Sequence, residues 1–201
     1  MKTLLSGLML ATICTAGLHA QGIDFGVKAG VNVANQKITG DYEPDTKAKI
    51  GIHGGVFVTW MFSEKLGIQP EVLFSAQGSK DKDDSYDYSI VTNYVSIPVL
   101  VRYDINDMFS VHAGPQFGVL VSAEEEFNGD SQDIKDDFKG TDVGIALGAE
   151  ADLPANFGVG LRYIFGVTNV LKEEMSFDDT ELKNGVFQIY VKFRIISGSD
   201  K

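Results

Sequence analysis

The chain has 201 residues, a formal net charge of −11, 22 glycines, one tryptophan and one cysteine. This length suits a single β-domain. The acidic segments argue against nucleic acid as a partner, because binding to phosphates depends on Lys and Arg. The cysteine, Cys14, lies among the first twenty residues, so disulfides cannot stabilise the remainder of the chain.

The first twenty residues have the pattern of a secretory signal peptide. Lys2 supplies the positive start, Leu4 to Ala16 form an apolar stretch, and Ala20 ends a small-residue cleavage site before Gln21. The apolar stretch is too short to cross a bilayer as a helix, and no run of roughly 18 apolar residues follows it. We therefore expect residues 1–20 to be removed, leaving residues 21–201 as one exported domain that is soluble or spans a membrane as a closed barrel.

Alternating segments then follow one another along the chain. Apolar residues occupy every second position in residues 23–34, 50–62, 66–77, 93–103, 109–121, 141–153, 157–169 and 186–196. A period of two predicts β-strands with one apolar face. These strands are longer than the roughly five or six residues that are usual in soluble domains. They match the roughly 9–11 residues that a tilted strand needs to cross a membrane.

The connections between these segments alternate in length. Residues 63–65, 104–108 and 154–156 are tight turns, whereas residues 35–49, 78–90, 123–140 and 170–185 are long, polar loops. Short turns on one rim and long loops on the other are typical of outer-membrane barrels. The sequence thus predicts an all-β fold, an eight-stranded antiparallel up-and-down transmembrane β-barrel, with both termini on the short-turn rim.

The second face of the strands combines glycine with charge. The glycines on it are Gly26, Gly30, Gly51, Gly55, Gly67, Gly114, Gly118, Gly144, Gly148, Gly158, Gly160 and Gly166. The charges on it are Lys28, Arg102, Arg162, Lys192 and Arg194 with Glu71, Asp104, Asp142, Glu150 and Asp152. The interior of an eight-stranded barrel is just wide enough for side chains to fill. We expect a salt-bridge network there, formed by Lys28, Glu71, Arg102, Glu150, Arg162 and Lys192, with a narrow polar pore as the alternative.

Aromatic residues and prolines mark further positions. An aromatic girdle at the membrane interface is predicted near the tight turns, from Trp60, Phe62, Tyr103, Phe109 and Phe157. Ordinary packing of the hairpin ends is the alternative for these rings. Pro70, Pro98 and Pro115 lie inside strands, and because proline cannot donate to a ladder we expect local bulges at them.

Candidate chemistry is sparse. His53 and His112 lie on the polar face, with His53 expected toward the long-loop rim and His112 toward the tight-turn rim, too far apart to share a metal. We expect both histidines to have hydrogen-bond partners. No spacing links His53 to a nucleophile such as Ser75, Ser89 or Ser122, so we expect no enzyme, no metal and no cofactor.

Residues 123–139 are rich in Asp and Glu. Their spacing does not match an EF-hand loop, so we expect a solvated acidic loop, with a Ca²⁺ site as the alternative.

Two stretches resemble a known family. Residues 94–103, which read Y-V-S-I-P-V-L-V-R-Y, and residues 113–118, which read A-G-P-Q-F-G, resemble the PorT-like family of outer-membrane β-barrel proteins. The first strand, F-G-V-K-A-G-V-N at residues 25–32, and the segment from Leu161 to Asn169 are also similar to that family. The end departs from it, because Phe193 is followed by Arg194-Ile195-Ile196 and a polar tail instead of a terminal aromatic residue. The resemblance implies an outer-membrane location and, for one branch, an accessory role in protein secretion.

Two function classes remain. The first is an outer-membrane barrel with a structural or interaction role, surrounded by outer-membrane lipid, expected to be monomeric, with long acidic loops outside that are available to a protein partner. The second is a soluble exported barrel of lipocalin type that binds a small apolar ligand. That alternative would turn the apolar faces inward and the glycine-rich faces toward water, where glycine weakens a strand.

Overall fold

Nine β-strands and one short helix make up the part of the chain that the structure describes. The structure is a computed structural model that describes residues 22–39, 46–81, 88–127, 130–172 and 181–198. The strands are β1 (Ile23–Thr39), β2 (Thr46–Met61), β3 (Leu66–Asp81), β4 (Tyr88–Asp104), β5 (Phe109–Phe127), β6 (Asp130–Asp133), β7 (Thr141–Asp152), β8 (Phe157–Gly166) and β9 (Glu181–Ile196). The helix is the 3₁₀ turn η1 (Lys135–Asp137). Within these residues, no helix has the length and hydropathy to cross a membrane.

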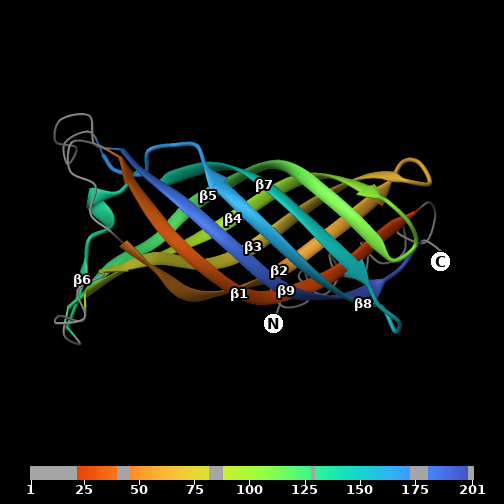
Figure 1. Ribbon diagram of the computed structural model, residues 1–201, viewed down its shortest axis with the longest axis horizontal. Coiled ribbons are helices and arrows are strands. Elements are labelled where there is room, and N and C mark those ends of the chain that lie inside the picture. Colours follow the sequence, from red (N-terminus) through yellow and green to blue (C-terminus); the bar gives the residue numbers. More distant parts are fainter. Residues whose placement is uncertain (1–21, 40–45, 82–87, 128–129, 173–180, 199–201) are drawn as a thin grey trace, which may run out of the picture.

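Eight of the strands close into an antiparallel ring. Their order is β4-β3-β2-β1-β9-β8-β7-β5, and β5 pairs back onto β4, while β6 adds to β5 outside the ring. Neighbours in the ring are neighbours in sequence, apart from β6 and the β1–β9 closure, which gives the up-and-down order. Figure 1 shows the long, tilted strands, with β6 at one end of the barrel and the tight turns at the other. The predicted fold class is confirmed.

The two faces of each strand differ in polarity. Val119, Leu147 and Leu161 are each half or more exposed on the outside, whereas Arg102 and Glu150 are buried inside at 4% and 2% exposure. An apolar outer surface needs lipid around it, because exposing that surface to water would cost free energy. A soluble ligand-binding barrel needs the opposite orientation, so the lipocalin-type alternative is wrong.

The strands run further than their hydrophobic pattern indicates. β1 extends to Thr39, β3 to Asp81 and β5 to Phe127, so parts of the predicted long loops are strand. Alternation of apolar residues ends where lipid contact ends, but backbone hydrogen bonds continue the ladder into polar sequence. The predicted loop of residues 123–140 is wrong in the same way, because it contains the end of β5, then β6 and η1.

The strand predicted at residues 157–169 is shorter in the structure. β8 ends at Gly166 rather than at Asn169, because the backbone N–H groups of Val167 and Thr168 both donate to the carbonyl of Val143. The chain then turns toward the interior, and Val170 is fully buried.

The tight turns hold both ends of their hairpins by local bonds. The Asn106 side chain accepts bonds from the backbone N–H groups of Met108 and Phe109. Ala155 and Asn156 both have positive φ, 60° and 65°, as a two-residue hairpin turn requires. β1 begins beside Trp60 and β9 ends beside Phe25, so the first and last strands meet at this rim, as predicted.

The prolines lie in regular register, so the expected bulges at them are wrong. Pro70 pairs with Val99, Pro98 with Gln116 and Pro115 with Ile145, without a register shift. On the opposite side of each proline, two partner pairs of the ladder are interrupted and then resume in the same register. A missing N–H therefore costs one local interruption, which a long ladder tolerates. The shifts occur instead near Gly26, Tyr94 and the stretch before His53.

The β2–β3 ladder is interrupted in its outer half, and a side chain bridges the interruption. Pairing lapses between Ala48 and His53 on β2. There the Asn32 side chain, from β1, donates to the carbonyl of Ala76 at 2.7 Å and that of Ile52 at 3.4 Å. One interior amide thus replaces ladder bonds that the two strands do not make with each other.

Candidate functional site

Two buried carboxylates are the centres of the polar interior, and the first is Glu71 on β3. Arg162 on β8 donates to both of its oxygens at 2.8 Å, a bidentate pair that is stronger than a single bond. Lys28 on β1 donates to the same carboxylate at 2.7 Å, and Gln69 donates at 2.8 Å. The third nitrogen of the Arg162 guanidinium, Nε, donates to His112 at 3.1 Å. Side chains from four strands, β1, β3, β5 and β8, therefore meet around the Glu71 carboxylate and its partners.

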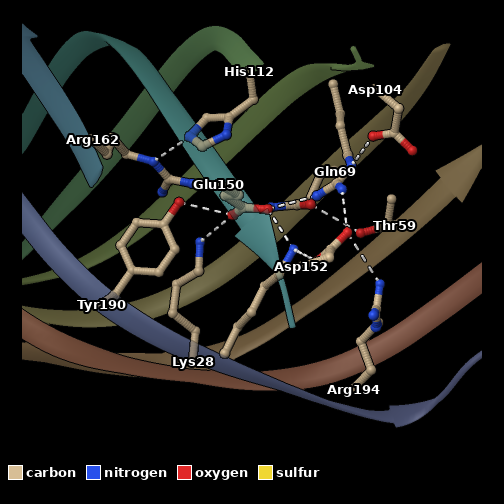
Figure 2. A network of polar contacts seen from close by, with 12 residues as sticks. Lys28, Thr59, Gln69, Asp104, His112, Glu150, Asp152, Arg162, Tyr190 and Arg194 are labelled. Atoms are coloured by element: carbon tan, nitrogen blue, oxygen red, sulfur yellow. Dashed lines mark hydrogen bonds and ion pairs between the residues drawn. The ribbon is translucent and has the colours of Figure 1, made fainter. Parts of the chain in front are cut away.

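The second centre is Glu150 on β7. Arg102 from β4 donates to it at 2.6 Å, Lys192 from β9 at 2.5 Å, and the Tyr190 hydroxyl at 2.8 Å. Arg102 also bonds Asp104 at 2.7 Å and Asp152 at 2.8 Å, so each part of its guanidinium has a carboxylate partner. Figure 2 shows Glu150 in the middle of this arrangement, with Arg162 and His112 on one side and Asp152 and Arg194 on the other.

Lys28 and Tyr190 connect the two centres. The Lys28 ammonium lies 3.6 Å from Glu150 as well as 2.7 Å from Glu71. It also lies 3.9 Å from the centroid of the Tyr190 ring, within range of a cation–π contact. The network is therefore continuous across the interior of the barrel, rather than a set of separate pairs.

The charges of the network nearly cancel. The cations are Lys28, Arg102, Arg162, Lys192 and Arg194, and the carboxylates that they contact are Glu71, Asp104, Glu150 and Asp152, which leaves a balance of +5 − 4 = +1. Buried charges are tolerated when each one is paired and hydrogen-bonded. Removing a single member would take one ion pair away from several buried partners at once.

Glycines give these long side chains their space. A Cβ on Gly148 would come within 2.5 Å of His112 Nε2, and a Cβ on Gly160 would overlap the Tyr190 ring. Gly148 lies on β7 and Gly160 on the neighbouring strand β8, and both face the interior. The interior is thus filled by large side chains set against positions that carry none, as the glycine-rich face predicted.

The outer half of the interior differs in chemistry. Neutral side chains join one another there: Gln188 donates to Asn32, Asn32 to Ser75, and Gln77 to Ser75. An apolar cluster lies farther along the strands, formed by Tyr94, Leu120, Ala123, Phe138, Val170 and Leu182. Phe138 and Val170 come from the connections after β5 and after β8, so these two connections fold inward.

Backbone bonds hold this inward-folded pair of connections, which we call the outer cap (residues 134–140 and 167–172). Lys139 donates to the carbonyl of Val170 at 2.8 Å, and Lys172 to that of Asp137 at 3.1 Å. Ile134 donates to the carbonyl of Ala123 on β5 at 2.9 Å, and Val170 to that of Leu182 on β9 at 2.9 Å. The outer cap is therefore bonded both to itself and to two strands of the ring.

The structure brings the six predicted network residues together. Lys28, Glu71 and Arg162 meet at the first centre and Arg102, Glu150 and Lys192 at the second. Asp142, the remaining charge of the same face, lies apart and accepts bonds from Thr168 and Asn184. The predicted girdle residues Trp60, Phe62, Tyr103, Phe109 and Phe157 are all exposed near the tight-turn end. Their role at the membrane interface stays a proposal.

The histidines border the network without forming a catalytic arrangement in the described residues. His112 accepts from Arg162, and the His53 ring lies edge-on to Tyr190 with centroids 6.1 Å apart. Both nitrogens of His53 lack a hydrogen-bond partner among the described residues, so the expectation of two hydrogen-bonded histidines is wrong for His53.

Ser75 lies directly opposite His53 in the β2–β3 register, but none of the candidate nucleophiles is hydrogen-bonded to that histidine in the described part of the chain. Ser75 bonds Asn32, Ser89 donates to Glu126 and Ser122 accepts from Asn93. No group of three or more His, Cys, Asp or Glu in the same residues is arranged to hold a metal. The absence of enzymatic activity stays a prediction.

The acidic segment is more ordered than a solvated loop. Glu124 on β5 pairs with Asp133 on β6, and Glu126 accepts bonds from Ser89 at 2.8 Å and from Lys49 at 3.0 Å. The Ser89 hydroxyl, followed by Lys49, lowers the pKa of the Glu126 carboxyl below its ordinary value. Because Glu126 lies near the surface, this pair contributes little to stability.

Three residues of the interior were not predicted from the sequence. The strand pattern could have indicated two of them, but not the third. Tyr190 and Gln69 share the interior parity of their strands, so alternation could have added them to the network. Phe138 lies in a polar connection without any periodicity, and nothing in the local pattern indicates that it is buried at 4% exposure. Its position depends on contacts with residues far away in the sequence.

Comparison with known proteins agrees with this architecture. A family model described as "Outer membrane protein beta-barrel domain" matches residues 19–172. That is more than half of the chain, so the chain belongs to this family, and the protein is an integral β-barrel of the cell outer membrane. Among curated proteins, no sequence matches the chain.

Two solved structures share its fold. One is Ail, the attachment invasion locus protein of Yersinia pestis, in complex with the heparin analogue sucrose octasulfate. It is 16% identical, with a TM-score of 0.50, and the match covers 87% of this chain and 99% of that one. The other is Neisserial surface protein A, which is 15% identical, with a TM-score of 0.50 and coverage of 87% and 100%. At such identities the likeness shows the fold alone.

Proposed function

We propose that this member of the outer membrane protein beta-barrel domain family is a closed barrel with a structural or interaction role, which presents its long-loop end to a partner outside the cell. The observation that carries the proposal is the ionic network. Side chains from β1, β4, β8 and β9 converge on Glu71 of β3 and Glu150 of β7 and fill the interior where a conducting barrel keeps water.

The outer cap supports the same reading. Phe138 and Val170 bury apolar surface inside the outer end, where a solute pathway would need polar lining. Two different barriers therefore lie in series along the interior, one ionic and one apolar. The narrow polar pore is the less favoured alternative, since a hydrated pathway would leave these charges partnered by water rather than by one another.

The resemblance to the PorT-like family adds a finer proposal, an accessory role in protein secretion. It rests on the I-P strand at residues 97–98 and the A-G-P strand at residues 113–115, which are ring neighbours, with Pro98 paired to Gln116. In this proposal the long-loop end contacts a protein of the secretion apparatus. Deleting this protein should then reduce the amount of secreted protein without changing the assembly of the outer membrane.

The proposed domain organisation completes this picture. Residues 1–20 act as a signal peptide that is removed on export, although they lie outside the described residues, and residues 21–201 form the barrel domain. The barrel works as a monomer, since its ring closes within one chain. N-terminal sequencing of protein from isolated outer membranes tests the first statement, and an intact Met1 would contradict it.

Reconstitution into planar bilayers tests the closed barrel. We expect no steady conductance from the wild type, because ions would have to displace the buried network. The double variant Glu71→Ala with Arg162→Ala removes a cation and an anion together and should raise the frequency of conducting events. Lys135→Ala, on η1, serves as the control and should behave like the wild type. Steady, ion-selective steps from the wild type would contradict the proposal.

Chemical crosslinking from the long-loop end tests the interaction role. A photoreactive group placed at Gln132 on β6 should capture a protein in intact cells, whereas the same group at Glu64 in a tight turn should not. Capture of the same protein from both positions would contradict a partner at the long loops.

A further inference from the structure

Two lysines face outward just beyond the apolar band of the barrel. On β1 the exterior positions are Val31, Val33, Asn35 and Lys37, and the first two are exposed apolar residues. On β9 the corresponding positions are Ile189, Phe187, Gly185 and Lys183. These two strands close the ring, and Lys37 lies directly opposite Lys183 in their register. Two cationic side chains therefore emerge side by side on the outer surface.

The height of this pair brings its side chains within reach of the headgroup layer. Lys37 is four residues past Val33, which is about 13 Å along the strand and about 9 Å in height for a strand tilted by about 45°. The headgroup layer is roughly 5–7 Å thick on each side of the hydrocarbon. Because a lysine side chain can extend back toward the membrane, both ammonium groups can reach this layer.

A tyrosine marks the same boundary. The ring of Tyr163 on β8 packs against Phe165 with centroids 4.4 Å apart. Its hydroxyl lies over Gly185, where an added Cβ would come within 2.9 Å of it. A tyrosine with its ring in the apolar band and its hydroxyl at the edge is typical of the headgroup level. The exterior position between Lys183 and Phe187 carries no side chain of its own, so the Tyr163 hydroxyl has room there, directly below the lysine pair.

The pair is electrostatically incomplete. Like charges directly opposite each other on neighbouring strands are destabilising. Lys183 has a partner on its own strand, Glu181, at 2.6 Å. Lys37 is exposed, and its ammonium group has no hydrogen-bond or ion-pair partner among the described residues. An anion placed between the two ammonium groups would remove the repulsion and supply the missing counter-charge.

We propose that Lys37 and Lys183 form a binding site for the phosphate group of an outer-leaflet lipid headgroup. A lysine binds phosphate as a point charge, and each one near a charged membrane surface contributes about 1 kcal/mol, a factor of about five in affinity. A membrane lipid is the source that the position favours, because the pair follows directly on the lipid-facing residues Val33 and Phe187 and lies beside Tyr163. This site is independent of whether the barrel is closed.

Lipid retention measured by native mass spectrometry tests the site. The full protein is extracted from outer membranes and placed in phosphatidylcholine nanodiscs that contain lipid A with its phosphates or dephosphorylated lipid A. We expect the wild type to retain phosphorylated lipid A. The Lys37→Gln and Lys183→Gln double variant should retain it about 25-fold less, a factor of about five for each lysine. Lys65→Gln, in a tight turn at the opposite rim, is the matched control and should equal the wild type.

Two further experiments distinguish the effect of charge from that of altered structure, and binding of a lipid from binding of a soluble anion. The double variant with Arg at both positions keeps the charge and should retain the lipid. Equal retention by the wild type and the Gln double variant would overturn the proposal, as would equal retention of dephosphorylated lipid A. If inorganic phosphate at equal concentration displaced the lipid completely, the membrane source would be wrong. Retention lost in the control Lys65→Gln would also overturn it, because the effect would follow net charge.

Discussion

The two halves of the barrel interior are filled in different ways. Toward the tight turns, Glu71 and Glu150 gather five cations between them and their neighbouring carboxylates. Toward the long loops, neutral amides and hydroxyls around Asn32 give way to the apolar cluster around Phe138. The first half is built from strands alone, whereas the second needs two connections that fold inward.

This difference predicts how each half responds to change. An ionic network is costly to leave incomplete, because each removed member leaves charges buried without a partner. An apolar cluster loses only contacts and can open locally. The tight-turn half should therefore control the stability of the whole barrel, and the outer half should control the order of its connections.

The largest effect is expected for Arg102→Ala. This variant leaves Asp104, Glu150 and Asp152 without one of their cations, and we expect a loss of about 3–5 kcal/mol in the free energy of unfolding. Urea unfolding in detergent micelles measures it. Lys135→Ala, an exposed charge on η1, should change stability by less than about 0.5 kcal/mol. Equal losses in the two variants would remove the distinction between the halves.

A smaller and more local effect is expected for Phe138→Ala. Truncating a buried Phe costs about 3 kcal/mol, but here the cost falls on the outer cap, which can open while the ring stays closed. Hydrogen exchange at the Lys139 amide, which donates to Val170, should accelerate by about a hundredfold. Exchange in the middle of β7 should stay unchanged. Uniform acceleration through all strands would show that the cap and the ring unfold together.

Overpacking tests the tight-turn half without removing a charge. In Gly160→Ala the new Cβ meets the Tyr190 ring and displaces its hydroxyl from Glu150, at a cost of about 1–3 kcal/mol. Gly140→Ala makes the same chemical change where nothing lies within 4 Å of the added Cβ, and it should be neutral. The comparison uses the same urea titration. A neutral Gly160→Ala would mean that the interior has room that the structure does not show.

The smallest effect concerns pH at the outer end. Because the Ser89 hydroxyl and Lys49 lower the folded-state pKa of Glu126, its stabilising contribution is present above the unfolded-state pKa and is lost as pH falls through the folded-state value. The contribution should stay below about 0.5 kcal/mol, since the Glu126 side chain is 43% exposed. Melting temperatures of wild type and Glu126→Gln should differ slightly at about pH 7 and converge once the pH falls below the folded-state pKa of Glu126. A difference that grows on acidification would contradict the assignment.

The fold could be predicted from the sequence because the two faces of each strand lie in different surroundings. Lipid selects Val119 and Leu161 for one face and the packed interior selects Arg102 and Glu150 for the other, so the alternation records the orientation directly. Strand ends could not be predicted in the same way, because Thr39 and Phe127 lie beyond the lipid, where polar sequence still forms the ladder.

The members of the ionic network could be predicted from the sequence, but the pairs that they form could not. Parity places Lys28, Glu71 and Arg162 inside, yet their pairing depends on strand tilt and register around the ring. The outer cap could not be predicted, because Phe138 and Val170 meet through backbone bonds between two separate connections. The prolines were misjudged because a closed ladder tolerates a missing N–H without a change in register.

The orientation of the sheet is tested most directly by methyl NMR of the protein in lipid nanodiscs. Leucine methyl groups occur on both faces, with Leu147 and Leu161 outside and Leu73 and Leu100 inside. We expect nuclear Overhauser effects from lipid acyl-chain protons to the methyl groups of Leu147 and Leu161, and none to those of Leu73 and Leu100. Acyl-chain contacts at Leu73 and Leu100, with none at Leu147 and Leu161, would contradict a barrel with lipid outside and charge within.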